Sequence, residues 1–167
     1  MNYQEAQGDL FNVPSQYYLA HCISSDFAMG AGIAKQFASM GVKEWLKFTC
    51  SSVKWNGQGY CLYTSACDKK DRYAGVFNLV TKEKYFLKPT YIALQQSLEN
   101  LRDVYLPVLS KNNETINIAM PEIGCGLDKL EWSRVSSIIK DVFCKSNVNI
   151  LIVHPNSFLK NGLTNSK

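Results

Sequence analysis

The pattern of hydrophobic positions alternates along the chain between the two-residue period of strands and the longer period of helices. Strand-like runs occupy residues 2–7, Tyr17–Cys22, Gly59–Ser65, Tyr73–Val80, Asn117–Met120 and Val148–His154. Helical patterns occupy Ile33–Met40, Val42–Phe48, the segment after Pro89 and the segment after Trp132. This order predicts an α/β fold in which a mostly parallel sheet is covered by helices and binds ligands at the carboxyl ends of its strands.

Prolines, glycines and charged runs mark the boundaries of these elements. Pro89 is expected in the first turn of a long helix, and Pro107 is expected to end or kink that helix. The apolar face of this helix consists of Leu94, Leu98, Leu101, Val104 and Tyr105. Two further turns are predicted: a charged turn at Asp68–Asp71, and a hairpin turn with an aromatic anchor at Trp55–Gly57.

The size and composition indicate a single domain. The chain has 167 residues, of which 46% are hydrophobic, so one domain with a sizeable core is feasible and two would be cramped. We expect this domain to span residues 1–155, followed by a mobile tail at 156–167 that is rich in Asn, Ser and Lys. No apolar run approaches the roughly 20 residues that cross a bilayer, and the amino terminus lacks a signal-peptide pattern. We therefore expect a soluble, intracellular protein, cytoplasmic or nuclear or both, with no membrane partner.

The residues that often carry metal or redox chemistry are few or scattered. Six cysteines lack C-x-x-C spacing, and an intracellular compartment would keep them reduced. Because only two histidines are present, neither a metal site nor a histidine-based triad is expected, and no cofactor is needed. The net charge of +4 comes from dispersed lysines, which suits an anionic ligand but forms no nucleic-acid-binding stripe. We expect a monomer.

The most informative local feature is a pair of glycine turns, Met29–Ala34 and Ile123–Asp128, each placed where a strand-like run gives way to a helical pattern. Glycine lets backbone N–H groups approach an anion closely, and the helix that starts near Ile33 would direct its unpaired amides at the same charge. The first turn lacks the third glycine or alanine of the dinucleotide-binding fingerprint. The two turns therefore predict two walls of one phosphate-binding crevice.

Four blocks of the sequence, in the right order, resemble macrodomains. They are Gly8–Phe11, Ala20–Ser24 leading into Met29–Ala34, Thr81-Lys82 before Lys88–Tyr91, and Met120–Asp128 followed by Trp132. Within that superfamily they are similar to the terminal ADP-ribose protein glycohydrolase branch, also described as O-acetyl-ADP-ribose deacetylase. The resemblance covers roughly residues 3–154 and implies a three-layer α/β/α sandwich around a six-stranded mixed sheet.

The resemblance implies that the chain binds ADP-ribose. Asp9 would accept the amino proton of adenine, and the N–H of Leu10 would reach a ring nitrogen. The other contacts it implies are Ser24, Met29, Gly30, Ala31, Gly32, Ile33, Thr81, Glu122, Ile123, Gly124, Cys125, Gly126 and Leu127. The residues themselves leave other interpretations open: Asp9 also suits a turn or helix cap, and the glycines suit ordinary turns. His21, inside an apolar strand, suits a structural role better than a catalytic one.

The resemblance implies a catalytic pair, Lys82 and Asp128. Lys82 follows a threonine just past the predicted strand, at the family's position for the lysine that attacks the anomeric carbon of the distal ribose. An amine attacks only when unprotonated, so a partner must handle its protons, and Asp128 would act as that general acid and base. The simpler alternatives are a solvated surface lysine and an aspartate that caps the helix carrying Trp132.

Two departures from related macrodomains bear on specificity. Ser24-Ser25-Asp26 occupies a loop that is rich in asparagine in many hydrolytic macrodomains outside this branch, and Glu122 stands where related chains carry arginine. The function implied is a hydrolase that removes mono-ADP-ribose from acidic side chains of proteins and deacylates O-acyl-ADP-ribose. The alternatives are a non-catalytic ADP-ribose reader and a phosphatase acting on ADP-ribose 1''-phosphate. Whether ADP-ribosylated nucleic acid is also a partner stays open.

Overall fold

A six-stranded sheet with the order β1-β6-β5-β2-β4-β3 forms the centre of the molecule. The computed structural model describes residues 1–65 and 73–156. The strands are β1 (Asn2–Gln7), β2 (Tyr18–Ser24), β3 (Tyr60–Ser65), β4 (Gly75–Lys82), β5 (Ile116–Met120) and β6 (Val148–His154). All neighbouring pairs are parallel except β3 with β4, which is antiparallel. The predicted mixed, mostly parallel sheet is confirmed.

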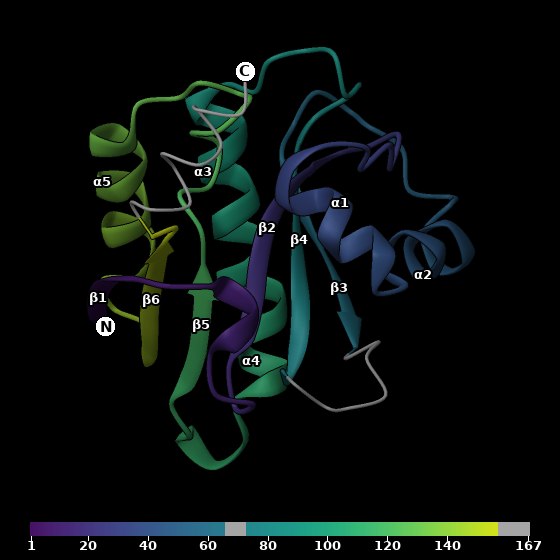
Figure 1. Cartoon of the computed structure of the whole chain (residues 1–167). Helices are drawn as coiled ribbons and strands as arrows, with labels where there is room; N and C mark the ends of the chain where they lie inside the picture. Colours follow the sequence, from purple (N-terminus) through teal and green to yellow (C-terminus); the bar gives the residue numbers. More distant parts are fainter. Residues whose placement is uncertain (66–72, 157–167) are drawn as a thin grey trace.

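Helices cover both faces of this sheet, which gives the predicted three layers (Figure 1). One face carries α1 (Gly32–Ser39) and α2 (Val42–Thr49), and the other carries α3 (Tyr91–Asn100) and α5 (Trp132–Phe143). The shorter helical segments are η1 (Leu10–Asn12), η2 (Leu101–Tyr105), α4 (Leu106–Leu109) and η3 (Lys111–Asn113). No helix in the described ranges has both the length and the apolarity to span a bilayer.

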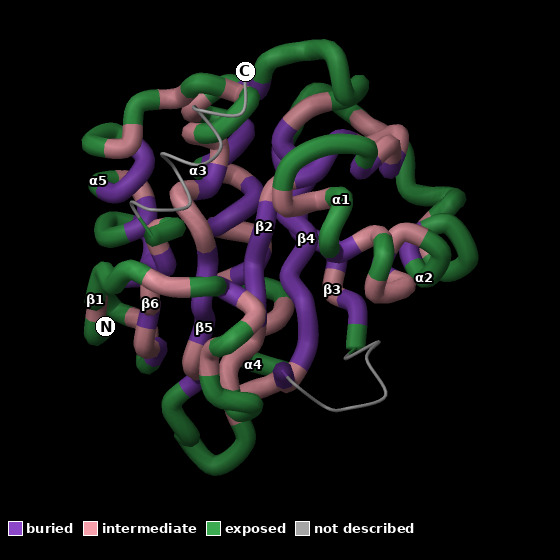
Figure 2. The backbone as a smooth tube through the Cα atoms, in the orientation of Figure 1, coloured by how far each residue is buried: buried purple, intermediate pink, exposed green. Residues whose placement is uncertain are grey.

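Alternate residues of strand β4 face opposite helical layers. Val76 and Val80 belong to the cluster that contains Phe37 of α1, whereas Phe77 and Leu79 belong to the cluster formed with α3 and α5. The first seven residues of β4 are buried, and Figure 2 shows this strand and most of β2 in the interior. Because β4 is enclosed on both faces and paired on both edges, its carboxyl end is held rigidly.

The long helix differs from its prediction at both ends. Tyr91 begins it, and the hydroxyl of the preceding Thr90 caps α3 by accepting the N–H of Ala93 at 3.0 Å. Pro89 precedes this cap, so its predicted place in the first turn is wrong. After α3 the hydrogen bonds change to the π pattern over η2, where the N–H of Leu106 reaches the carbonyl of Leu101.

This π segment also moves the predicted apolar face. Because its hydrogen bonds span five residues instead of four, Leu106 replaces Val104 as the buried residue after Leu101. Val104 is 48% exposed, so its predicted place in the core is wrong. Pro107 has no N–H to donate and is the second residue of α4, which ends at Leu109.

Two predicted turns have different outcomes. Asn56 and Gly57 do form a tight turn, in which the N–H of Gln58 donates to Asn56 Oδ1 at 3.1 Å and Gly57 has a φ of 92°. The turn lies in the connection from α2 to β3 with no strand before it, so the predicted hairpin is wrong. Trp55 does act as an anchor, with its ring 6.2 Å from that of Tyr60. The charged turn at Asp68–Asp71 and the tail from residue 157 lie outside the described residues.

His21 is a structural residue of the core. It is fully buried in β2, stacks on Phe37 at a centroid distance of 3.9 Å, and lies with Nε2 2.6 Å from Asn78 Oδ1. Asn78 uses its amide nitrogen to donate to Leu62 and Thr64, so its oxygen is the acceptor and His21 Nε2 is the donor. Burial lowers the pKa of His21 to about 4, although the hydrogen bond to Asn78 opposes this shift.

The first prediction follows from this pKa. In the unfolded chain His21 is protonated near the ordinary pKa of 6.5. Lowering the pH from 6.5 to 4 should therefore reduce the free energy of unfolding, by about 3 kcal/mol from His21 alone. His21→Gln should remove that contribution, so denaturant unfolding of the variant should depend less on pH in this window. A variant whose stability falls as steeply as that of the wild type would contradict the assignment.

Candidate active site

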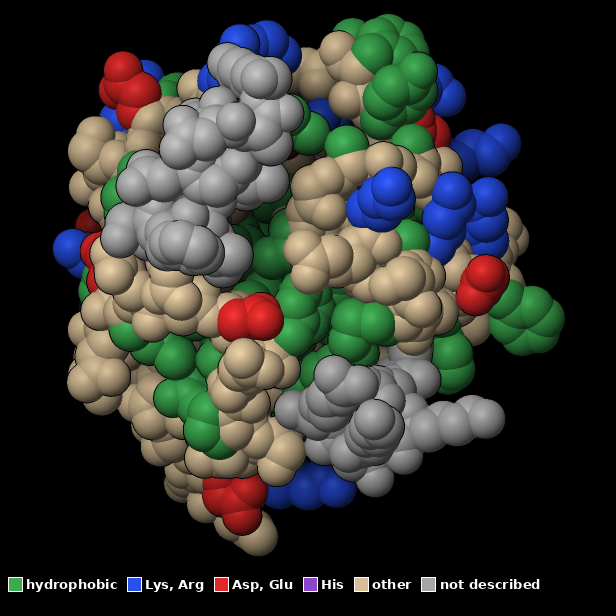
Figure 3. All heavy atoms as spheres, viewed as in Figure 1, with side chains coloured by type: hydrophobic (Ala, Val, Ile, Leu, Met, Phe, Trp, Pro, Cys, Tyr) green, Lys and Arg blue, Asp and Glu red, His purple; other side chains and the backbone are tan. Residues whose placement is uncertain are grey.

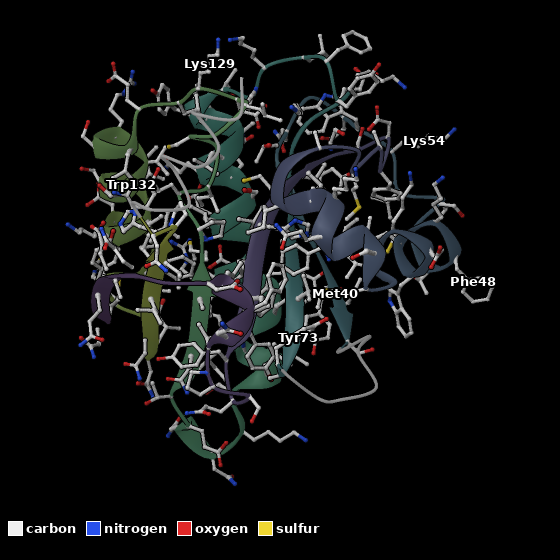
Figure 4. The ribbon with its side chains drawn as sticks, viewed as in Figure 1. Met40, Phe48, Lys54, Tyr73, Lys129 and Trp132 are labelled. Carbon is white, nitrogen blue, oxygen red and sulfur yellow. The ribbon has the colours of Figure 1, made fainter. Side chains whose placement is uncertain are left out.

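The carboxyl ends of β1, β6, β5, β2 and β4 meet at one edge of the sheet because these strands are parallel. Ser24 pairs directly with Lys82 at the ends of β2 and β4. Figure 4 places Lys129, from the loop after β5, at this edge, and Tyr73, which precedes β4, at the opposite one. The segments that contain the residues implied as ligand contacts all begin at this edge.

Lys82 and Asp128 are in direct contact. Lys82 Nζ donates to Asp128 Oδ1 at 2.6 Å, and the two side chains are only 13% and 18% exposed. The prediction placed Lys82 just past its strand, but β4 extends to include it. A lysine at the end of an enclosed strand, paired with a carboxylate across the site, is not a solvated surface residue. The pair supplies an amine together with an adjacent group that accepts its proton.

Asp128 does not act as a helix cap. Glu131 stands at the N-cap position of α5, and no side chain caps that helix. Of the two functions that the sequence left open for Asp128, the helix cap is not formed, and the carboxylate faces Lys82. The loop after β5 positions it through two backbone bonds, from Lys129 N–H to Gly126 and from Leu130 N–H to Gly124.

Two cysteine thiols near this pair are held in the protonated form. Burial, the negative charge of Asp128 and the nearby Cys125 raise the pKa of Cys22 far above its ordinary value, while Lys82 opposes this. Burial and the charge of Glu122 raise the pKa of Cys125 to about 11. Because the thiolate is the reactive form of cysteine, neither residue is a nucleophile at neutral pH. Lys82 is the better candidate for covalent chemistry at this position.

Asp26 organises the loop between β2 and α1, and the sequence analysis assigned it no role. Its Oδ1 accepts the hydroxyl of Ser24 at 2.5 Å and the N–H of Ala28 at 3.1 Å, and its Oδ2 accepts the N–H of Tyr85 at 3.1 Å. Burial alone would raise the pKa of Asp26, but these hydrogen bonds lower it below its ordinary value. An aspartate two residues before a turn is a known signal for such an Asx turn, so this role was detectable.

The backbone of this first loop is strained. Phe27 and Met29, both buried, have φ values of 53° and 47°, and Gly32 has a φ of 58°. Left-handed conformations are uncommon for large side chains and persist only where the surroundings enforce them. Lys43 contributes to this by donating to the carbonyl of Ala28 at 3.0 Å. The loop therefore holds Met29–Ile33 in one defined conformation.

The two glycine loops lie against each other and present unpaired N–H groups. A Cβ added to Gly32 would lie 3.9 Å from Leu127 Cδ1, which places the first loop beside the second. Within the described part of the chain, no protein acceptor is recorded for the N–H groups of Gly30, Ala31, Gly32, Ile33, Gly126, Leu127 and Asp128. Such donors beside a helix N-terminus suit an anionic ligand.

Asp9 is both a cap and an exposed acceptor. Its Oδ1 accepts the N–H of Phe11 at 2.9 Å and so caps η1, which is the structural role that the sequence left open. No partner is recorded for its second oxygen or for the N–H of Leu10 within the described part of the chain. The side chain of Leu10 is buried and fixes the backbone beside them. The capping role therefore leaves one acceptor and one donor at the edge of the site.

Glu122 belongs to a hydrogen-bonded cluster that also contains His154 and Glu5. His154 lies between two carboxylates, with Nδ1 2.5 Å from Glu122 and Nε2 2.6 Å from Glu5. Glu5 also accepts hydrogen bonds from Tyr3 and from the indole of Trp132. The negative charge at position 122 is therefore partnered by His154, a residue to which the sequence analysis gave no role.

The other implied contact residues lie at the same edge with varied exposure. Thr81 is buried, and its hydroxyl has no hydrogen-bond partner among the described residues. Ile123 is buried, whereas Leu127 is 73% exposed. Gly124 has a φ of 72°, which favours glycine there. Within the described ranges, no group of three or more His, Cys, Asp or Glu side chains is arranged to bind a metal ion.

Comparison with known proteins agrees with this arrangement. The family model described as "Macro domain" matches residues 20–139. The curated relative ADP-ribose glycohydrolase OARD1 of Homo sapiens is 40% identical over 148 residues, which cover 87% of each chain. The macrodomain of Mycobacterium tuberculosis DarG has the same fold, with a TM-score of 0.74 at 19% identity over 93% of this chain and 98% of its own. The structure of Thermosipho africanus DarTG in complex with ADP-ribose matches with a TM-score of 0.71 at 19% identity, over 92% of this chain and 42% of its own. The chain therefore belongs to the macro domain family.

Proposed function

We propose that this protein is an ADP-ribose hydrolase that releases mono-ADP-ribose from acidic side chains and deacylates O-acetyl-ADP-ribose. The observation that carries the proposal is the 2.6 Å contact between Lys82 and Asp128 beside two loops that present unpaired N–H groups. An ADP-ribose glycohydrolase is 40% identical over most of the chain. A protein that only reads ADP-ribose needs the loops but not a shielded lysine–aspartate pair.

The ligand is proposed to lie along the carboxyl edge of the sheet. Adenine contacts the free carboxylate oxygen of Asp9 and the N–H of Leu10. The diphosphate lies between the two glycine loops, where backbone N–H groups and the start of α1 favour negative charge. This orientation brings the distal ribose to the end of β4, within reach of Lys82.

The reaction is proposed to proceed through an adduct on Lys82. Asp128 takes a proton from the Lys82 ammonium group, and the lone pair of the resulting amine attacks the anomeric carbon of the distal ribose. The bond from that carbon to the acyl oxygen breaks, and the acyl group leaves as a carboxylate. Asp128 first passes its proton to the solvent and so becomes a carboxylate again. Water then attacks the same carbon, the bond from that carbon to the Lys82 nitrogen breaks, and Asp128 transfers a proton from the water to the departing amine, so that ADP-ribose is released.

The second prediction tests the adenine contact. Asp9→Asn keeps an oxygen that caps Phe11 but replaces the outward oxygen with an NH₂ group, which cannot accept the amino proton of adenine. We expect the variant to fold normally and to lose roughly 1.5 to 3 kcal/mol of affinity for ADP-ribose by calorimetry. Unchanged affinity would remove Asp9 from the site.

The third prediction compares two glycines of the second loop. A Cβ at Gly126 meets no atom within 4 Å, so Gly126→Val should fold, while its side chain occupies the space proposed for the diphosphate. Binding of both ADP and ADP-ribose should be abolished. Gly124→Ala is the structural control: with a φ of 72° and Leu130 2.9 Å from the added Cβ, it should lower the stability itself. Wild-type affinity in Gly126→Val would exclude close approach of the ligand to this loop.

The fourth prediction tests the nucleophile with glutamate-linked mono-ADP-ribosylated protein. Lys82→Arg keeps a positive charge beside Asp128, but guanidinium stays protonated and cannot attack, so turnover should be lost while ADP-ribose still binds. Lys82→Ala should behave in the same way. Asp128→Ala should also lose turnover, and intact-protein mass spectrometry should detect an ADP-ribosyl adduct on Lys82 if its resolution is slowed more than its formation. Full hydrolysis by Lys82→Arg would rule out the covalent route.

A further inference from the structure

An exposed apolar patch begins three residues after Lys82. It consists of Tyr85, Phe86 and Leu87, which are 65%, 69% and 43% exposed, and is called the 85–87 patch below. In Figure 3, hydrophobic side chains gather at the upper edge of the molecule, over the loop that joins β4 to α3. Apolar side chains that are contiguous and exposed near a site are typical of a surface that contacts another molecule.

The 85–87 patch is held in a fixed position relative to the catalytic pair. The N–H of Tyr85 donates to Asp26 Oδ2, and the same carboxylate shapes the first glycine loop. Next to it, the N–H of Ser25 donates to the carbonyl of Lys82 at 2.9 Å. The N–H of Leu87 closes a turn onto the carbonyl of Lys84 at 3.1 Å. These hydrogen bonds hold the 85–87 patch in place beside the first glycine loop.

The geometry points to the polypeptide that carries ADP-ribose as the molecule that docks on this patch, an inference that rests on the proposed function. In the proposed reaction, the scissile bond lies next to the amine of Lys82. The backbone from Lys82 to Tyr85, the first residue of the patch, spans at most about 10 Å. Residues that flank a modified glutamate therefore reach the patch. Lys84 and Lys88, both exposed, border it and complement an acidic polypeptide. The preferred substrate carries an aromatic or aliphatic residue within about three positions of the modified acidic residue.

The arrangement of the rings favours a polypeptide over a nucleic acid. The rings of Tyr85 and Phe86 meet edge to face, with centroids 5.4 Å apart and an angle of 89° between their planes. Successive bases stack in nearly parallel planes, and two perpendicular rings do not provide parallel platforms for them. Leu87 adds an aliphatic surface, which suits an apolar side chain.

The test compares three substrates on the full chain. They are O-acetyl-ADP-ribose, which has no polypeptide, and two glutamate-linked ADP-ribosylated acidic peptides, one with leucine and phenylalanine and one with serines next to the modified residue. The variant Tyr85→Ser/Phe86→Ser keeps the backbone bond to Asp26. Phe48→Ser is the matched control, since Phe48 is 88% exposed and lies at the outer end of α2 in Figure 4, away from the patch.

The wild type should prefer the apolar peptide. The double variant should lower kcat/KM for that peptide about tenfold, through KM, and leave kcat and the hydrolysis of O-acetyl-ADP-ribose unchanged. Phe48→Ser should match the wild type on all three substrates. Lys88→Glu, which removes no apolar group, should weaken both acidic peptides and spare O-acetyl-ADP-ribose.

Each other outcome contradicts a distinct claim. A wild type that hydrolyses none of the substrates refutes the proposed function itself. If the wild type is active, the docking role is refuted by equal peptide kinetics in wild type and double variant, or by a parallel loss on O-acetyl-ADP-ribose. An ADP-ribosylated oligonucleotide is tested as a fourth substrate: a larger loss on it than on the apolar peptide would assign the patch to nucleic acid instead and overturn the inference.

Discussion

The parallel alignment of five strands is the constraint on which the site depends. Parallel strands place all their carboxyl ends at one edge, so residues far apart in the sequence, such as Asp9, Ser24, Lys82 and Asp128, emerge together. The antiparallel partner β3 is the exception, and it protects the outer edge of β4. Because both faces of β4 are covered by helices, the end of that strand cannot move without disturbing two hydrophobic clusters. A nucleophile at this position is therefore pre-organised by the core of the protein and not by a flexible loop.

The Lys82–Asp128 pair is better explained by chemistry than by stability. Removing two charges from water is unfavourable, and their mutual attraction often does no more than offset that penalty. The two side chains are less than one-fifth exposed, so most of this penalty applies. A pair of apolar residues would fill the same space without it. Retaining an amine and a carboxylate at 2.6 Å makes sense where the proton between them has to move.

The sequence was sufficient for the architecture and insufficient for details that arise from packing across the chain. Strand and helix periodicity predicted every strand of the sheet, and the macrodomain resemblance predicted which residues meet at its edge. The periodicity did not reveal the π segment. Helical patterns are recognised by apolar residues spaced three and four positions apart, whereas Leu101 and Leu106 are five positions apart. It also missed the role of Asp26: the turn from Asp26 to Ala28 was detectable, but the bond from Tyr85 joins residues that are 59 positions apart and that only the fold brings together. The roles proposed for Lys82 and Asp128 could not be derived from periodicity at all, since a lysine after a strand and an aspartate before a helix usually have simpler explanations.

The cluster around His154 explains how a reversed charge at position 122 is accommodated. Glu122 Oε1 lies 2.5 Å from His154 Nδ1, so a hydrogen bond to this ring holds the glutamate side chain in place. Glu5 approaches the opposite nitrogen of the same ring, so the second glycine loop is linked through His154 to β1, the strand that leads to Asp9. The backbone strengthens this link, because the N–H of Gly8 donates to the carbonyl of His154 at 2.8 Å. Position 122 is therefore linked through His154 to the strand that leads to Asp9.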